Sequence, residues 1–212
     1  MTQVEHESAR RTGATAADSV PLGLAALAVT LFLFSARNAD WTDGTDAWLG
    51  SALAFGGLVQ LLAGMWAFHN RSAFWATALS SYGAFWLGLG LYVVLLAGAA
   101  GPGAQADDLG WIMLAFAIYN VTLMTLSSQV NQIVLAIFVA LEATLIILFV
   151  GYLTETDTTL RVGGYIGVLT ALCAWYASAA TLLNAMAGRP VVNLGRPLFQ
   201  SLLPHTTRAP RR

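Results

Sequence analysis

A single carboxylate interrupts a long apolar stretch of the sequence. Glu142 stands near the middle of the run QIVLAIFVALEATLIILFV, which carries no other charge. A charge at that depth in a bilayer costs roughly 2.5 to 3.5 kcal/mol on insertion scales, so such a residue normally faces protein or water and marks a function. The chemistry open to it is the binding and release of a proton. The alternative is a neutral Glu142 that joins helices through a hydrogen bond to Ser, Thr or Tyr.

No other set of residues matches a catalytic or metal-binding motif. The histidines lie in polar segments: His6, His69 and His205. Cys173 is the one cysteine, so no intrachain disulfide can form, and all ten basic residues are arginine, which excludes a retinal Schiff base on lysine. Metal motifs, nucleophile elbows and P-loops are absent. We expect no enzyme activity, no cofactor and no metal, and the net charge of -1 argues against nucleic-acid binding.

The elements that must position Glu142 are membrane-spanning helices. Of the 212 residues, 57% are hydrophobic and 10% are charged, whereas a soluble domain carries about 25% charged residues. A spanning helix needs roughly 20 apolar residues. Six such stretches follow one another, at 21–37, 47–68, 73–97, 109–128, 131–153 and 163–187. The sequence predicts an all-α membrane protein with six transmembrane helices.

The arginines predict how these helices are oriented. Cytoplasmic loops carry an excess of basic residues, and eight of the ten arginines fall on the side of both termini, leaving only Arg37 and Arg161 on the other. We expect residues 1–19 to be a disordered cytoplasmic tail without a signal peptide, 20–188 the transmembrane domain, and 189–212 a basic cytoplasmic tail. The protein should lie in the cell (inner) membrane, with both termini cytoplasmic.

Small residues predict how the helices associate. Lipid tails are as apolar as leucine side chains, so helices in a bilayer pack through close contacts between small residues. Gly163 and Gly167 form a small-xxx-small pair on the sixth stretch. We expect this pair to pack against a neighbouring helix.

Three blocks, taken together, carry a resemblance to a known family. They are PLGLAALAVTLFLFSARNA at 21–39, GGLVQLLAGMWAFHNRSAFWATALSSYGAFWL at 56–87, and GGYIGVLTALCAWYASAATLLN at 163–184. With them the chain resembles the acetate and succinate transporter family of bacterial acetate permeases and fungal ammonia/acetate export proteins. The resemblance implies six helices, passage of acetate and other short carboxylates, often with proton coupling, and a homo-hexamer with one pathway in each subunit.

The same resemblance implies a hydrophobic constriction. Members narrow their pores with an aromatic residue on the first helix, the Tyr of Ser-Tyr-Gly on the third and a Leu on the fifth, and an alanine on the sixth affects substrate size. The matching positions are Leu27, Tyr82, Leu141 and Ala174. Leu27 departs from the pattern, so the implied constriction lacks one ring. Glu142 also departs, because a neutral residue is usual there.

Polar residues on the predicted helices suggest a path for an anion. A carboxylate that leaves water needs donors to replace its hydration. The candidates along the path are Thr30, Gln60, Tyr82, Asn120 and Thr144. Except at Tyr82, the favoured alternative for each of them is an interhelical hydrogen bond. Apolar Leu27 and Leu141 would then select small, weakly hydrated species.

The place of Glu142 beside Leu141 limits its role. Neighbouring helical residues point about 100° apart, so Glu142 should face an adjacent helix or subunit if Leu141 faces the pathway. We predict that Glu142 binds the co-transported proton, or fixes packing that must shift during transport.

Two other functions remain open from the sequence. The same pore would serve a channel or exporter for formate, ammonia or hydrated carbon dioxide. The small-residue helix faces would also suit a membrane scaffold that organises partners and transports nothing.

Overall fold

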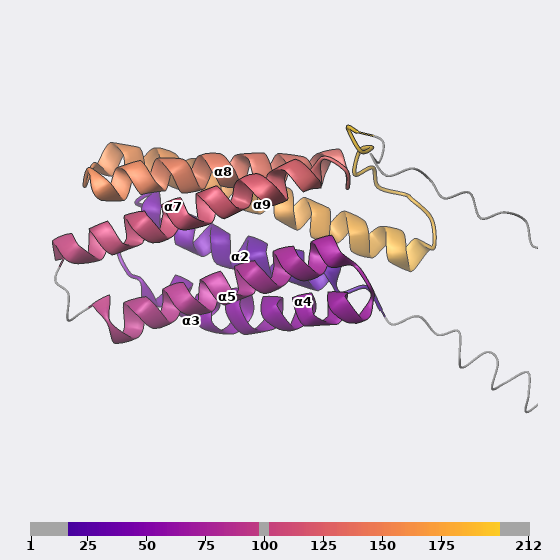
Figure 1. Ribbon diagram of the computed structural model, residues 1–212, viewed down its shortest axis with the longest axis horizontal. Helices are drawn as coiled ribbons and strands as arrows, with labels where there is room; N and C mark the ends of the chain where they lie inside the picture. Colours follow the sequence, from indigo (N-terminus) through magenta and orange to yellow (C-terminus); the bar gives the residue numbers. More distant parts are fainter. Residues whose placement is uncertain (1–16, 98–101, 200–212) are drawn as a thin grey trace, which may run out of the picture.

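The chain forms a bundle of long helices in the computed structural model, which describes residues 17–97 and 102–199 (Figure 1). The elements are α2 (Val20–Asn38), α3 (Asp46–Leu53), the π-helical η1 (Ala54–Val59), α4 (Gln60–His69), α5 (Ala73–Leu95), α7 (Pro102–Ser127), α8 (Gln132–Leu153) and α9 (Asp157–Ala187). Among the described residues, six helices are long and apolar enough to cross a membrane, with α3, η1 and α4 forming one span. The predicted all-α fold with six spanning helices is confirmed.

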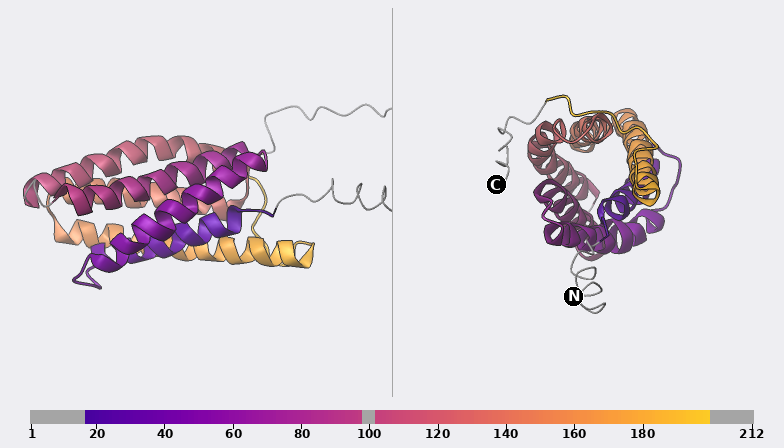
Figure 2. Two further views of the ribbon diagram at one scale, coloured as in Figure 1. Left: turned by 90° about the horizontal axis from the view of Figure 1, so that it is seen from below. Right: turned by 90° about the vertical axis from the view of Figure 1, so that its right-hand side faces the viewer.

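The six spans close into a ring. α2 packs against α9, α9 against α8, and α8 against α7, while α5 packs on α4 and η1, which return to α2. α5 also touches α7, which completes the ring. The end-on view in Figure 2 shows the helices arranged around a common interior. α2 is the most enclosed, since 67% of its spanning window is buried against 28% to 44% in the other five.

Two helices begin earlier than the apolar pattern predicts. α7 begins at Pro102 rather than at 109, because proline is tolerated in the first turn, where its missing N–H would have no partner. α9 begins at Asp157 rather than at 163, because a carboxylate in the first turn complements the helix dipole. The residues of low hydropathy at these two starts therefore belong to the helices, which extend beyond their apolar parts.

The second span is not a uniform α-helix, although the sequence predicted one helix over 47–68. Its π-helical turns contain Gly56, where a side chain would meet the side chain of Thr30 on α2. Thr30 Oγ1 in turn lies 2.7 Å from Ser51 Oγ. The wide turns of η1 thus lie where the second span comes closest to α2.

Residues 189–199, predicted as part of a tail, pack on the end of the bundle. α9 ends at Gly188, which adopts the left-handed conformation with φ of 63°. Beyond it, the N–H of Ile133 donates to the carbonyl of Leu194 at 3.2 Å, and the N–H of Leu198 donates to the carbonyl of Ser128 at 2.9 Å. This segment is therefore fixed to the turn between α7 and α8. The predictions for residues 1–16 and 200–212 lie outside the described residues.

The glycines of α9 allow it to approach two helices closely. A Cβ on Gly163 would lie 2.7 Å from the side chain of Leu148 on α8. A Cβ on Gly164 would meet the backbone nitrogen of Ala39 and lie 2.7 Å from the carbonyl oxygen of Ser35, both at the end of α2. Gly167 likewise contacts the side chain of Ser35. The predicted small-residue pair therefore serves α8 and α2 together.

Replacement of Gly164 by alanine tests this contact. A Gly164→Ala side chain would press on backbone atoms, which cannot rotate away, so we expect a loss of about 1 to 3 kcal/mol in stability. Thermal unfolding of the detergent-purified protein, followed by tryptophan fluorescence, measures it. The control is Gly88→Ala on α5, because among the described residues nothing outside its own stretch of helix lies within 4 Å of the added Cβ. Equal unfolding temperatures for the two variants would contradict the close contact.

Candidate functional site

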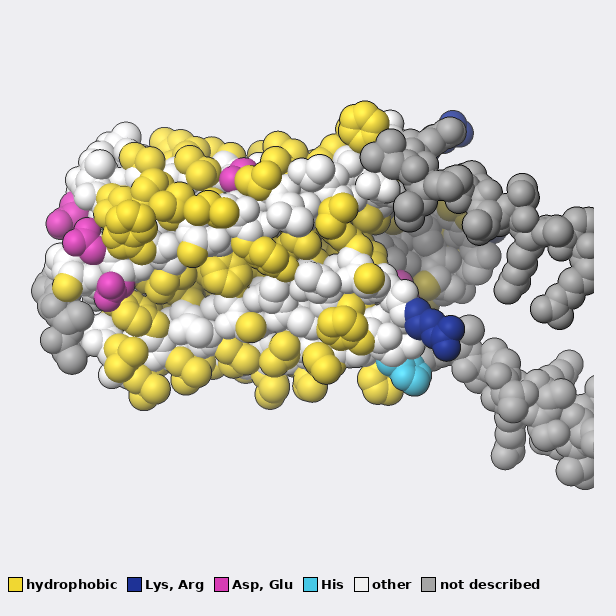
Figure 3. Space-filling view, in the orientation of Figure 1, with side chains coloured by type: hydrophobic (Ala, Val, Ile, Leu, Met, Phe, Trp, Pro, Cys, Tyr) yellow, Lys and Arg dark blue, Asp and Glu magenta, His cyan; other side chains and the backbone are white. Residues whose placement is uncertain are grey.

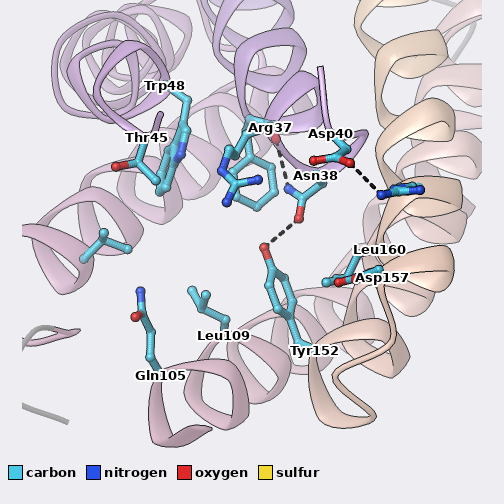
Figure 4. A pocket seen from close by; sticks show the side chains of 13 residues that line it. Arg37, Asn38, Asp40, Thr45, Trp48, Gln105, Leu109, Tyr152, Asp157 and Leu160 are labelled. Carbon is cyan, nitrogen blue, oxygen red and sulfur yellow. Dashed lines mark hydrogen bonds and ion pairs between the residues drawn. The ribbon is translucent and has the colours of Figure 1, made fainter. Parts of the chain in front are cut away.

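An open polar cavity of about 390 Å³ lies at one end of the bundle (Figure 4). It is formed by the end of α2, the starts of α3, α7 and α9, and the end of α8. Its polar and charged lining consists of Arg37, Asn38, Asp40, Thr45, Gln105, Asp157 and Arg161, with the hydroxyl of Tyr152. We call it the outer cavity.

Hydrogen bonds fix two polar side chains in the wall of the outer cavity, those of Tyr152 and Asn38. Tyr152 Oη donates to Asn38 Oδ1 at 2.8 Å, and Asn38 Nδ2 donates to the carbonyl of Phe34 at 2.9 Å. The side chain of Asn38 thus ties α8 to the last turn of α2.

Besides one ion pair, the described lining of the outer cavity carries one further cation, Arg37, and one further carboxylate, Asp157. Arg161 pairs with Asp40 at 2.6 Å, with both side chains half exposed. The side chain of Arg37 extends toward the interior of the cavity (Figure 4) and lines it. Within the described part of the chain, its guanidinium has no hydrogen bond or salt bridge. A guanidinium in such a position matches the charge and the planar geometry of a carboxylate.

A second cavity lies deeper in the bundle and is almost closed. Its free space is about 10 Å³, which is room for no more than one water molecule. Its walls are apolar except for Tyr82, Trp86 and Thr144: Leu27, Leu31, Phe34, Phe85, Met113, Leu141, Leu145 and Leu148 complete them. We call it the closed cavity. The structure brings Leu27, Tyr82 and Leu141 together here, as the implied constriction requires.

A chain of hydrogen bonds leads from the closed cavity to Glu142. Tyr82 Oη donates to Asn120 Oδ1 at 2.7 Å, and Asn120 Nδ2 donates to Glu142 Oε2 at 2.8 Å. The same Nδ2 also donates to the carbonyl of Phe138 at 3.0 Å. Glu142 therefore faces α7 and not the closed cavity. Its hydrogen-bond partner is an amide rather than the Ser, Thr or Tyr of the structural alternative.

Of the other predicted path residues, Thr144 alone is among the described residues that line these two cavities. Thr30 is fully buried and bonds Ser51 between α2 and the second span. Gln60 is buried, and among the described residues its Oε1 has no partner. Ala174 is fully buried on α9. Thr144 lines the closed cavity, but its hydroxyl donates to the carbonyl of Ala140 at 2.8 Å.

Three residues of the site were missed from the sequence. Phe34 and Trp86 stand in apolar runs, where an aromatic side chain is indistinguishable from a packing residue. Trp86 is 2% exposed, and in the described chain its Nε1 has no hydrogen-bond partner. Arg37 was used only to orient the helices. Its position one residue before Asn38, at the end of an apolar run, was the available signal that it faces a cavity.

Metal ligands do not cluster at these cavities in the part of the chain that the structure describes. Among residues 17–97 and 102–199, no group of three or more His, Cys, Asp or Glu side chains is close enough to hold a metal ion. The described lining of the two cavities offers two guanidinium groups, two carboxylates, a few hydrogen-bonding side chains and apolar walls.

The fold and the site define a class, that of multi-pass membrane proteins whose helices enclose a polar cavity leading to a narrow apolar constriction. Residues 2–192 match the GPR1/FUN34/yaaH family. The chain belongs to this family, which confirms the resemblance read from the sequence blocks and the expectation that it is not an enzyme.

Similar proteins agree with this assignment. Acetate permease A of Emericella nidulans is 33% identical over 81% of this chain, and the chain spans 61% of the length of that permease. The succinate-acetate/proton symporter SatP of Escherichia coli is 24% identical over 84% of this chain and 95% of its own length. The solved structure of the bacterial acetate channel SatP has the same fold, with a TM-score of 0.81, 23% identity, and coverage of 85% of this chain and all of that one.

Removal of the Tyr82 hydroxyl tests the hydrogen-bond chain. Tyr82→Phe leaves Asn120 Oδ1 buried without a donor, which costs about 1 to 3 kcal/mol in stability. Thermal unfolding in detergent measures the loss. The matched control is Tyr119→Phe on α7, whose hydroxyl donates to Ser81 Oγ at 3.1 Å in a partly buried position. A Tyr82→Phe variant as stable as the Tyr119→Phe variant would show that the bond contributes nothing.

Proposed function

We propose that the protein is a channel or transporter for acetate and related short-chain carboxylates. One observation carries the proposal: Leu27, Tyr82 and Leu141, three residues far apart in the sequence, line one closed apolar cavity on the inner side of a polar cavity that contains Arg37. The names of the relatives, an acetate permease and a succinate-acetate/proton symporter, support the same substrate class.

The outer cavity selects solutes by charge, and the closed cavity selects them by size and polarity. Arg37 attracts a carboxylate into the outer cavity, where the anion keeps much of its water. The closed cavity then admits only what fits its narrow apolar walls, which favours a methyl group over larger or doubly charged groups. Desolvation of a second carboxylate in apolar surroundings is costly. Acetate, with one charge and one methyl group, meets both conditions.

The distribution of charge supports an orientation with cytoplasmic termini. Figure 3 shows most of the acidic side chains on this face gathered at one end of the apolar bundle, and basic and histidine side chains at the opposite end. Arg71 lies in the turn at the tail end, between α4 and α5. By the excess of basic residues in cytoplasmic loops, we place the tails in the cytoplasm and the outer cavity on the far side of the inner membrane.

The surface around Glu142 supports assembly into a homo-oligomer, which we expect to be a hexamer. Val139 and Ile146 share the face of Glu142 on α8 and are 49% and 40% exposed in the single chain. An ionisable residue at mid-membrane depth normally faces protein or water rather than lipid. A neighbouring subunit that covers this face would provide the protein environment.

Proton coupling is assigned to Glu142 on the basis of its hydrogen bond to Asn120. Glu142→Gln keeps an oxygen that can accept from Asn120 Nδ2 but cannot release a proton. We expect acetate uptake by this variant in liposomes to lose most of its dependence on pH. The matched control is Glu155→Gln in the exposed outer turn, which should keep the parental profile. A normally assembled Glu142→Gln protein with the parental pH profile would overturn the proton role.

A flux assay tests the function itself. Purified protein in liposomes should take up labelled acetate faster than protein-free liposomes, which measure the leak of acetic acid through lipid. The uptake should increase with an inward proton gradient and be reduced by unlabelled short carboxylates. Reduction by formate or ammonium alone would point to another small solute. Liposomes that move no solute, with a protein that retains a bound partner, would favour the membrane scaffold.

A further inference from the structure

The structure places an aromatic ring on the first spanning helix that the sequence did not assign to the pathway. Leu27 occupies the position where the resemblance implies a ring. Leu27, Leu31 and Phe34 follow the i, i+4, i+7 spacing of one helix face, and all three line the closed cavity. At 1.5 Å per residue, Phe34 lies about 10 Å nearer the outer cavity than Leu27 does.

Phe34 separates the two cavities. Among the described residues that line them, it alone is common to both. Its side chain is 4% exposed, so the ring fills the space between the polar and the apolar part. A solute in the outer cavity therefore meets the ring of Phe34 before it meets Leu27, Tyr82 or Leu141.

Two tryptophans hold this ring in a defined position. Its centroid is 5.2 Å from that of Trp48 with an interplanar angle of 76°, and 5.6 Å from that of Trp86 with an angle of 73°. Both arrangements are the edge-to-face contacts that aromatic pairs prefer. Trp48 belongs to α3 and Trp86 to α5, so the ring closes the gap between three helices.

The closed cavity cannot receive a carboxylate while the ring stays in this position. Its free space of about 10 Å³ suits a single water molecule, and acetate is larger. Movement of Phe34 between Trp48 and Trp86 is the change that would join this space to the 390 Å³ of the outer cavity.

The indole of Trp86, which packs on the ring of Phe34, carries a hydrogen-bond donor. Trp86 lines the closed cavity, and its Nε1 has no partner among the described residues. A buried donor without an acceptor is unfavourable, and a carboxylate oxygen entering past Phe34 would satisfy it. Trp86 thus contacts the ring of Phe34 and carries a buried N–H that is left without an acceptor among the described residues.

We propose that Phe34 is the outer gate and the size filter of the pathway, and that the indole N–H of Trp86 receives the carboxylate behind it. The inference rests on the transport function proposed above. The resemblance implies that an aromatic ring on the first helix selects the substrate, at the position that Leu27 occupies. We assign this role to Phe34, which lies two helical turns away.

Uptake of labelled acetate and butyrate into liposomes tests the gate with Phe34→Ala and the smaller change Phe34→Leu. A hydrophobic pocket discriminates a single methylene by about tenfold or more, so we expect the butyrate-to-acetate uptake ratio of Phe34→Ala to rise about tenfold. Phe34→Leu should give a smaller rise. The unfolding temperature of each variant is measured alongside.

The matched control is Phe32→Ala on the same helix. The ring of Phe32 packs on Trp41 and Trp175, at 6.2 and 5.3 Å, and lines neither cavity. Its uptake ratio should stay at the parental value. Parental ratios in both Phe34 variants, with normal acetate uptake by the parent, would overturn the gate alone. A parent that takes up neither acid would overturn the gate and the transport function together.

Trp86→Phe tests the donor separately. It keeps an aromatic ring beside Phe34, but a phenyl ring replaces the indole, so the N–H is lost. We expect the acetate concentration for half-maximal uptake to rise severalfold, whereas Trp175→Phe should leave it unchanged. An unchanged half-maximal concentration in Trp86→Phe would show that Trp86 does not receive the carboxylate.

Discussion

The structure depends on one constraint: in the hydrocarbon of a bilayer, a polar side chain has no water and must find its partner within the protein. Asn120 meets this constraint for three helices at once. Its amide, fully buried on α7, accepts from Tyr82 of α5 and donates to Phe138 and Glu142 of α8. The constriction and the mid-membrane carboxylate are therefore held by the same group, although Tyr82 faces the interior and Glu142 the outside of the bundle.

The second requirement is close packing, and α2 is the helix that contributes residues to both cavities together with the closest contacts to α9. This helix is the most enclosed of the six, and the glycines of α9 let it approach the end of α2 at backbone distance. Leu27, Phe34 and Arg37 all belong to α2, so the lining of both cavities depends on the position and rotation of this one helix. The site is thus built from the helix that has the least freedom to move as a whole, and side-chain motion is the simpler way to open it.

The sequence predicted the six spans well, because hydropathy over twenty residues is a strong signal in a membrane protein. It misplaced the starts of α7 and α9, where a first-turn proline and a first-turn carboxylate begin a helix before its apolar window. It could not say which way each residue faces, since helices that are apolar on every side have no distinct polar face. Tyr82 and Leu141 were found through motif blocks, whereas Phe34 and Trp86 belong to apolar runs in which only the rotation of the helix distinguishes a lining residue from a packing one.

The amide of Asn120 also limits what can travel between Glu142 and the constriction. The carbonyl of Phe138 can only accept, which fixes Nδ2 as the end of the amide that faces α8 and Oδ1 as the end that faces Tyr82. An amide with fixed donor and acceptor ends cannot relay a proton as a hydroxyl can. Glu142 and Tyr82 are therefore linked only through the position and orientation of a neutral amide. Under the proton role proposed for Glu142, the proton itself would need a different route.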